Sequence, residues 1–168
     1  ISDDRGILHA LGRTVHKRGA FGHLGEVLMT LYVVELQVPA NTPDIDPVKK
    51  EVYVEGGVIV WVEVHFPPGV AAKVKTALFS GHYQIFPRPF GTWLTGDGET
   101  IRAELFHVLE ARSAKLTVYG KSPGSLYPHT IIWRINVLPK QIAMPWLAFS
   151  NLVEAIYNFI NMLSGGRR

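Results

Sequence analysis

The stretch VIVWVEVH, from Val58 to His65, carries a valine at every even-numbered position. Ile59, Trp61 and Glu63 stand between the valines. Because successive side chains of a β-strand point to opposite faces, this alternation predicts a strand with its valines toward a core. Ile59 and Trp61 are then expected on the outward face. The proline pair at 67–68 ends the strand, since proline cannot donate to a sheet ladder.

Other β-prone runs lie on both sides of this stretch, at residues 27–38, 48–54, 73–79, 82–86, 100–106, 115–119 and 130–138. Clusters of Gly, Pro and Asp separate the runs, as turns require, and the Gly56-Gly57 pair is expected to end the run at 48–54. Seven or eight short strands without an intervening helical pattern predict an antiparallel β-sandwich of the jelly-roll or immunoglobulin-like type. The side chains expected to be buried between its two sheets are Val60, Val62, Leu116, Val118, Ile131, Trp133 and Ile135.

The periodicity changes near the C-terminus. Apolar residues spaced three, four, three, four and three apart predict an amphipathic helix over residues 145–163: Trp146, Phe149, Val153, Ile156, Ile160 and Leu163. Pro145 suits the first turn and Gly165 suits the end. The residues expected at an oligomer interface are Trp146, Phe149, Leu152, Val153, Ile156, Phe159, Ile160 and Met162.

Three interpretations of this helix stay open. It can pack across its own sandwich, pack against another subunit, or lie in a membrane surface. The membrane interpretation is disfavoured because such helices carry Lys and Arg on their polar face. Here the polar stripe consists of Asn151, Glu154, Asn158 and Asn161.

Residues 1–26 contain five glycines, three histidines and four cationic residues. Dense glycine opposes a helix, so we expect a flexible basic arm. Arg13, Lys17 and Arg18 are its candidates for contact with a partner or with the phosphates of a nucleic acid. The chain thus divides into this arm (1–26), a β-sandwich (27–139) and a C-terminal amphipathic helix with a basic end (140–168).

The composition points away from catalysis. Of 168 residues, 47% are apolar and only 18% are charged, so the chain is expected either to bury an unusual share of its surface or to share some of it with partners. It has no cysteine, and it lacks serine nucleophile elbows, phosphate-binding loops, dinucleotide fingerprints and zinc-protease motifs. The acidic pairs Asp44/Asp46 and Asp97/Glu99 offer too few oxygens for calcium and are expected in turns. We therefore predict no enzyme activity, no cofactor and no metal.

A second kind of surface is predicted around outward aromatic residues. Ile59, Trp61 and Trp93 are candidates for a ligand or partner surface. Such residues suit either carbohydrate stacking or an intersubunit contact.

Several motifs carry a resemblance: VPANTP at 38–43, FPPG at 66–69, GHYQIFP at 81–87, GTWLTGD at 91–97 and YPHTIIWR at 127–134. Over about residues 30–140 the chain resembles small β-sandwich proteins encoded among structural genes of viruses and proviruses of thermophiles. The resemblance carries no catalytic residue. It implies a virion subunit of capsid, decoration or tail type, located in an assembled particle and otherwise in the cytoplasm.

We therefore expect a non-enzymatic structural protein that associates with copies of itself, through its arm and helix, and with other structural proteins of the same assembly. The alternative is a carbohydrate- or ligand-binding β-sandwich module.

Overall fold

The structure is a computed structural model that describes residues 29–164. The predictions for the arm, including Arg13, Lys17 and Arg18, lie outside the described residues.

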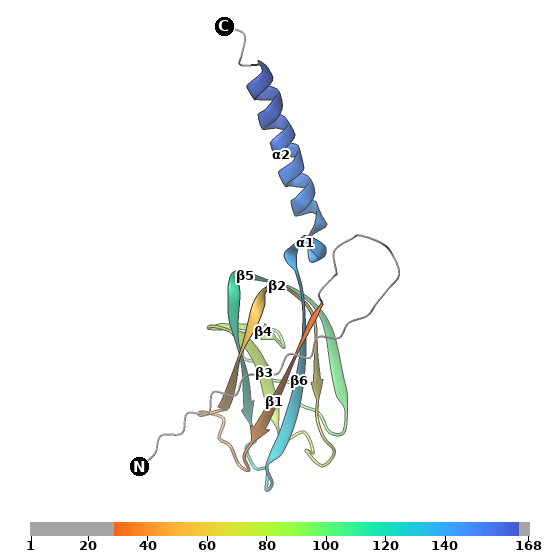
Figure 1. Cartoon of the computed structure of the whole chain (residues 1–168). Coiled ribbons are helices and arrows are strands. Elements are labelled where there is room, and N and C mark those ends of the chain that lie inside the picture. Colours follow the sequence, from red (N-terminus) through yellow and green to blue (C-terminus); the bar gives the residue numbers. More distant parts are fainter. Residues whose placement is uncertain (1–28, 165–168) are drawn as a thin grey trace, which may run out of the picture.

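The described chain contains β1 (Thr30–Val38), β2 (Val48–His65), β3 (Lys75–Ser80), β4 (Tyr83–Phe86), β5 (Thr100–Lys121), β6 (His129–Leu138), α1 (Lys140–Ala143) and α2 (Pro145–Ser164) (Figure 1). All strand pairs are antiparallel, in the order β1-β6-β2-β5-β3-β4. The prediction of a mainly β, antiparallel fold followed by a C-terminal helix is confirmed. The prediction of a two-sheet sandwich or jelly roll is not, because the described strands form one continuous sheet.

Two long strands replace four of the predicted short ones. β2 runs through the Gly56-Gly57 pair that was expected to end a strand, and β5 joins the runs at 100–106 and 115–119. A Cβ on Gly56 would collide with the carbonyl oxygen of Ala111, and one on Gly57 with that of Leu138. The register of β2 against β5 shifts at this point. The glycines therefore allow neighbouring backbones to approach closely at a bend, instead of forming a turn.

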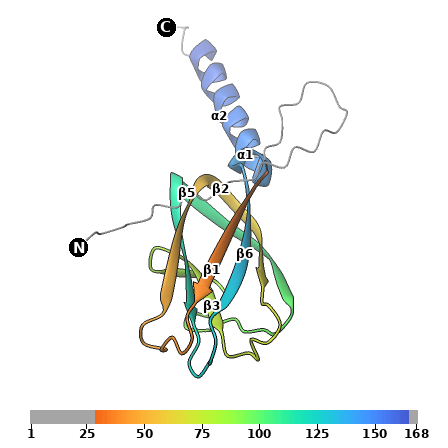
Figure 2. The ribbon, with the colours of Figure 1, turned by 60° about the horizontal axis from the view of Figure 1, so that its bottom comes forward.

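The sheet coils until its two ends face each other. β1 and β6 pass across β3 and the second half of β5 (Figures 1 and 2). Trp133 on β6 donates a hydrogen bond from Nε1 to Oγ1 of Thr76 on β3, at 3.0 Å. A Cβ on Gly120 of β5 would lie 2.6 Å from side-chain atoms of both Leu36 and Val38 on β1. One sheet thus encloses its own core.

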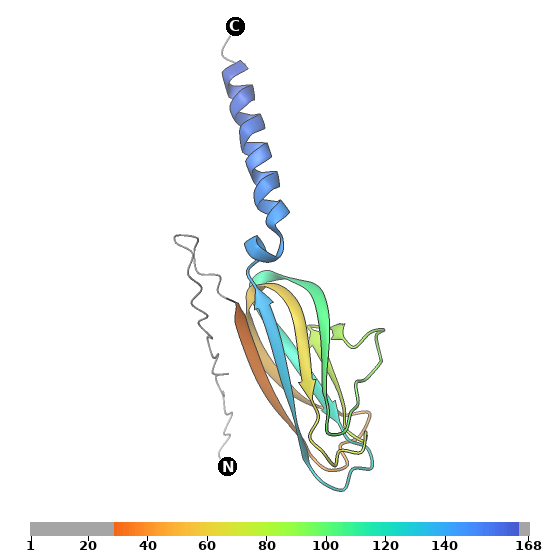
Figure 3. The same ribbon diagram turned by 90° about the vertical axis from the view of Figure 1, so that its right-hand side faces the viewer.

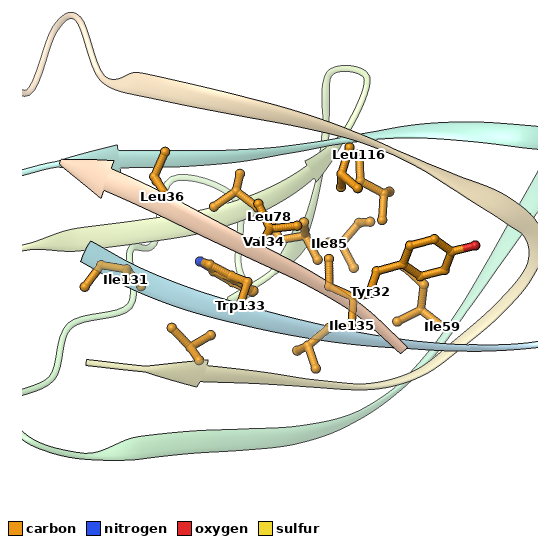
Figure 4. Close-up of a cluster of buried hydrophobic side chains, with 14 of the residues drawn as sticks. Tyr32, Val34, Leu36, Ile59, Leu78, Ile85, Leu116, Ile131, Trp133 and Ile135 are labelled. Carbon is orange, nitrogen blue, oxygen red and sulfur yellow. The ribbon is translucent and has the colours of Figure 1, made fainter. Parts of the chain in front are cut away.

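Side chains from every strand fill this core, and Figure 4 shows ten of them labelled between the ribbons. The predicted core residues Val62, Leu116, Val118, Ile131, Trp133 and Ile135 are buried, as expected. Trp133 is the largest of the fully buried side chains and confirms the predicted register of β6.

Two residues of β2 depart from the prediction. A β-bulge lies between Ile59 and Trp61, where β2 has one residue more than β6 and one residue fewer than β5. Val60 is consequently only half-buried, and Ile59 is fully buried. The prediction of Ile59 as part of an outward surface is therefore wrong, because the bulge interrupts the alternation on which it depended.

Candidate interaction surfaces

The C-terminal helix begins where the sequence places it. Met144 separates α1 from α2 with φ −133° and ψ 64°, outside the helical region. Pro145 disfavours a helical conformation in the residue before it and is itself favourable in a first turn. The helix then continues to Ser164, which confirms the predicted helix over residues 145–163.

Helix α2 projects away from the sheet (Figures 1 and 3). Its eight predicted interface residues are all exposed in the single chain, from 50% for Val153 and Ile156 to 71% for Met162. Within one chain, the interpretation of α2 as a cover for its own core is wrong. The physical reason is that the coiled sheet already fills its core with its own side chains.

One aromatic contact connects α2 with the sheet. The rings of Trp146 and Phe106, which lies on β5, stack with centroids 6.2 Å apart and an interplanar angle of 29°. Both side chains remain more than half exposed. The apolar surface of α2 therefore continues from its first turn onto β5.

The exposed fractions of the eight interface residues correspond to on the order of 1,000 Å² of surface, about one partner's share of a stable protein interface. The largest apolar patch of an ordinary monomer covers only about 300–600 Å². The exposed apolar face of α2 is thus larger than the largest apolar patch of an ordinary monomer.

The two predicted tryptophan platforms each have a cation over the ring. The guanidinium carbon of Arg102 lies 4.3 Å from the ring centroid of Trp61, and Nζ of Lys121 lies 4.1 Å from that of Trp93. In such a contact, the negative face of the aromatic ring attracts the cation. In each case a ligand that stacks on that face must displace the cation first.

One residue of each acidic pair makes a structural contact. Asp44 forms a 2.7 Å ion pair with Lys121, whose side chain is only 10% exposed. The hydrogen bond from Lys121 lowers the pKa of the Asp44 carboxyl. Asp97 accepts a hydrogen bond from the backbone N–H of Gly69 at 2.8 Å. Within residues 29–164, no group of three or more His, Asp or Glu side chains is arranged to hold a metal ion.

A further surface lies beside β4 and was not predicted. A shallow cavity of about 500 Å³ is lined by His82, Tyr83, Gln84, Arg88, Pro89 and Phe90. Tyr83 stacks on His107 of β5, with centroids 5.8 Å apart and rings 11° from parallel. Burial lowers the pKa of His107, and the nearby charge of Arg88 lowers it further. The available sequence signal was the run HYQIFPRPF at 82–90, where aromatic residues and one arginine alternate with prolines.

Comparisons with known proteins leave the family of this chain open. No family model matches the sequence, and no curated protein matches it. Two solved structures are similar at low levels. A chain from the disulfide-linked pili of Bacillus endospore appendages is 10% identical, with a TM-score of 0.36, over 74% of this chain and 100% of its own length. FLHE is 12% identical, with a TM-score of 0.34, over 66% of this chain and 97% of its own length. Structural similarities this weak support no conclusion about function.

A membrane-spanning helix is not found in the part of the chain that the structure describes, where no helix is both long and apolar enough.

Proposed function

We propose that this chain is a non-enzymatic structural subunit that assembles with copies of itself through helix α2. The observation that supports the proposal most directly is the exposed apolar face of α2, held away from a core that is already complete. We further propose that the assembly is a particle such as a virion, in which the chain serves as a capsid, decoration or tail-type subunit beside other structural proteins.

The free energy of burial favours association. At about 25 cal/mol per Å², burying half of the apolar face of α2 stabilises a complex by roughly 10 kcal/mol before the entropic cost of association. That cost is of similar size, so the helices need well-packed contacts as well as area. The stack of Trp146 on Phe106 helps here, since it orients the first turn of α2 before any partner arrives.

The spacing of the apolar residues indicates other copies of the same helix as the partner. Trp146, Val153 and Ile160 occupy the a positions of a heptad repeat, and Phe149 and Ile156 occupy d positions. A repeat of this kind packs against an equivalent repeat in a coiled coil. In a parallel arrangement, the Trp146 residues of neighbouring subunits lie at the same level.

The residue types favour more than two helices. β-Branched residues at both a and d shift coiled coils toward three or four strands. Here Val153 and Ile160 stand at a, and Ile156 stands at d. The flanking g positions, Leu152 and Phe159, are also apolar and exposed, which widens the face beyond the seam of a two-stranded coil. We therefore propose a parallel bundle of at least three subunits.

The experiment measures the mass of the full chain in solution by multi-angle light scattering. We expect the unmodified chain to form an oligomer and the double variant Ile156→Asp/Phe159→Asp to be monomeric with an unchanged β-sheet circular dichroism signal. The matched control is Asn151→Asp/Asn158→Asp, which adds the same two charges to the polar stripe of the same helix. The control should remain assembled.

A monomeric unmodified chain, or an Ile156→Asp/Phe159→Asp variant that stays assembled, would overturn the proposal. A monomer that binds lipid vesicles through α2 would assign the helix to a membrane surface instead. Electron microscopy of the unmodified chain checks the finer part of the proposal, because a particle subunit should form shells, tubes or rings.

A further inference from the structure

The loop after β4 is held by one buried side chain. Gln84 is 4% exposed, and its Nε2 donates to the carbonyl oxygens of Pro87, at 2.6 Å, and Thr92, at 2.7 Å. Its Oε1 accepts a hydrogen bond from the backbone N–H of Gly91 at 2.9 Å. All three bonds hold residues 87–92 in one arrangement. A surface ordered in this way pays little additional conformational entropy when it binds a ligand.

Phe90 lies at the exposed part of this loop. Its side chain is 76% exposed, although its ring meets Phe79 edge to face, with centroids 6.4 Å apart. Phe79 in turn meets Tyr119 edge to face at 5.1 Å. These contacts orient the ring of Phe90 while leaving most of it exposed, and the residue lines the cavity of about 500 Å³. An oriented and exposed aromatic ring is a stacking surface for a ligand with an apolar face.

The polar groups of the cavity are cationic or neutral. None of its six lining residues is acidic. The guanidinium of Arg88 lies 4.8 Å from the ring centroid of Tyr83, and its Nε makes a long bond of 3.4 Å to the carbonyl oxygen of Ile85. Among the described residues, no carboxylate lies within ion-pair distance of Arg88. The guanidinium therefore lies beside the cavity without an ion-pair partner among residues 29–164.

We propose that this cavity binds an acidic saccharide, with the apolar face of a sugar ring on Phe90 and the sugar carboxylate on Arg88. A planar guanidinium pairs with a carboxylate through two parallel hydrogen bonds, which favours the acid over a neutral sugar. The cavity is shallow, so it suits one unit of a longer chain that continues across the surface. It is separate from α2 and does not depend on self-association.

The test uses the full chain and two probes of equal length, an oligogalacturonate and the corresponding neutral oligogalactose, with binding followed by calorimetry. We expect the acidic probe to bind in the millimolar range or tighter and the neutral probe at least about tenfold more weakly, a difference of about 1.4 kcal/mol. Arg88→Gln should remove the preference for the acidic probe, and Phe90→Ala should weaken the binding of both probes about tenfold or more.

The matched control is Tyr53→Ala, which removes another exposed aromatic side chain, on β2, and should bind as the unmodified chain does. The circular dichroism of each variant checks that its fold is retained. The inference is wrong if the acidic probe does not bind at millimolar concentration, if Arg88→Gln binds it equally well, or if inorganic phosphate displaces it completely at equal concentration. That last result would leave a simple anion site. None of these outcomes depends on the mass of the oligomer, so a failure here is distinct from a failure of the proposed assembly.

Discussion

The contact between Trp133 and Thr76 joins the two facing parts of the coiled sheet, so its removal tests the fold directly. Trp133 is fully buried, and its Nε1 donates to Oγ1 of Thr76 at 3.0 Å. Oγ1 of Thr76 in turn donates a hydrogen bond to the carbonyl oxygen of Tyr119 on β5 at 2.7 Å. The three groups form a short chain of hydrogen bonds beside the hydrophobic core cluster that contains Trp133.

Trp133→Ala should lower the free energy of unfolding by about 3–5 kcal/mol, because it removes a large buried ring and leaves a cavity. Thr76→Val keeps the shape of the side chain but removes both hydrogen bonds. It leaves the indole N–H and the Tyr119 carbonyl without this partner, which should cost about 1–3 kcal/mol. Trp133→Phe retains most of the ring and should cost less than Trp133→Ala.

The magnitude of the contact itself comes from a double-mutant cycle with Trp133→Phe and Thr76→Val. We expect a coupling of about 1 kcal/mol, the net value of one buried hydrogen bond. The assay is urea unfolding followed by circular dichroism at one fixed protein concentration, since association would add to the apparent stability. Additive effects of the two substitutions, or a Thr76→Val variant as stable as the unmodified chain, would refute the facing arrangement of β6 and β3.

Three further predictions concern single residues. Gly57→Ala should destabilise the chain by about 1–3 kcal/mol, because the new Cβ meets the Leu138 carbonyl; an unchanged urea midpoint would contradict the close approach at this bend. Asn136→Leu should stabilise the chain by about 1–3 kcal/mol in the same assay. The reason is that both polar side-chain atoms of Asn136 are buried without a hydrogen-bond partner in the described structure. A less stable variant would show that the amide is needed. For His107, burial and the charge of Arg88 place the pKa in the folded chain below the unfolded value of about 6.5. As the pH decreases below about 6.5, the unfolded chain therefore takes up the proton first, and the free energy of unfolding should fall. Unfolding measured across this range should show a smaller slope in His107→Gln, and an equal slope would assign the effect to another group.

Periodicity within one element could be read from the sequence. The alternation at residues 130–138 correctly placed Ile131, Trp133 and Ile135 in the core. The three-and-four spacing correctly placed a helix after Pro145. Both patterns follow from the geometry of a single strand or helix, so no knowledge of neighbouring elements was needed.

The interruptions of these patterns could not be read in the same way. Gly56 and Gly57 looked like a turn, because glycine serves turns and close backbone approaches equally well. The carbonyl groups that require glycine there belong to Ala111 and Leu138, which are distant in sequence. The bulge that buries Ile59 likewise depends on the register of β2 against β5 and β6.

For the candidate sites, the wide apolar face of α2 was predictable from the sequence, since it depends only on residue types and helical spacing. The exposure of this face was not predictable, because whether a sheet can complete its own core depends on how all of its strands coil together. The same distinction between predictable and unpredictable features applies to the cavity beside β4. The bonds of Gln84 to residues 87–92 are local, whereas the stack of Tyr83 on His107 requires β4 and β5 to meet in space. Local geometry is encoded within a few neighbouring residues, but contacts between distant segments arise only when the whole chain has packed.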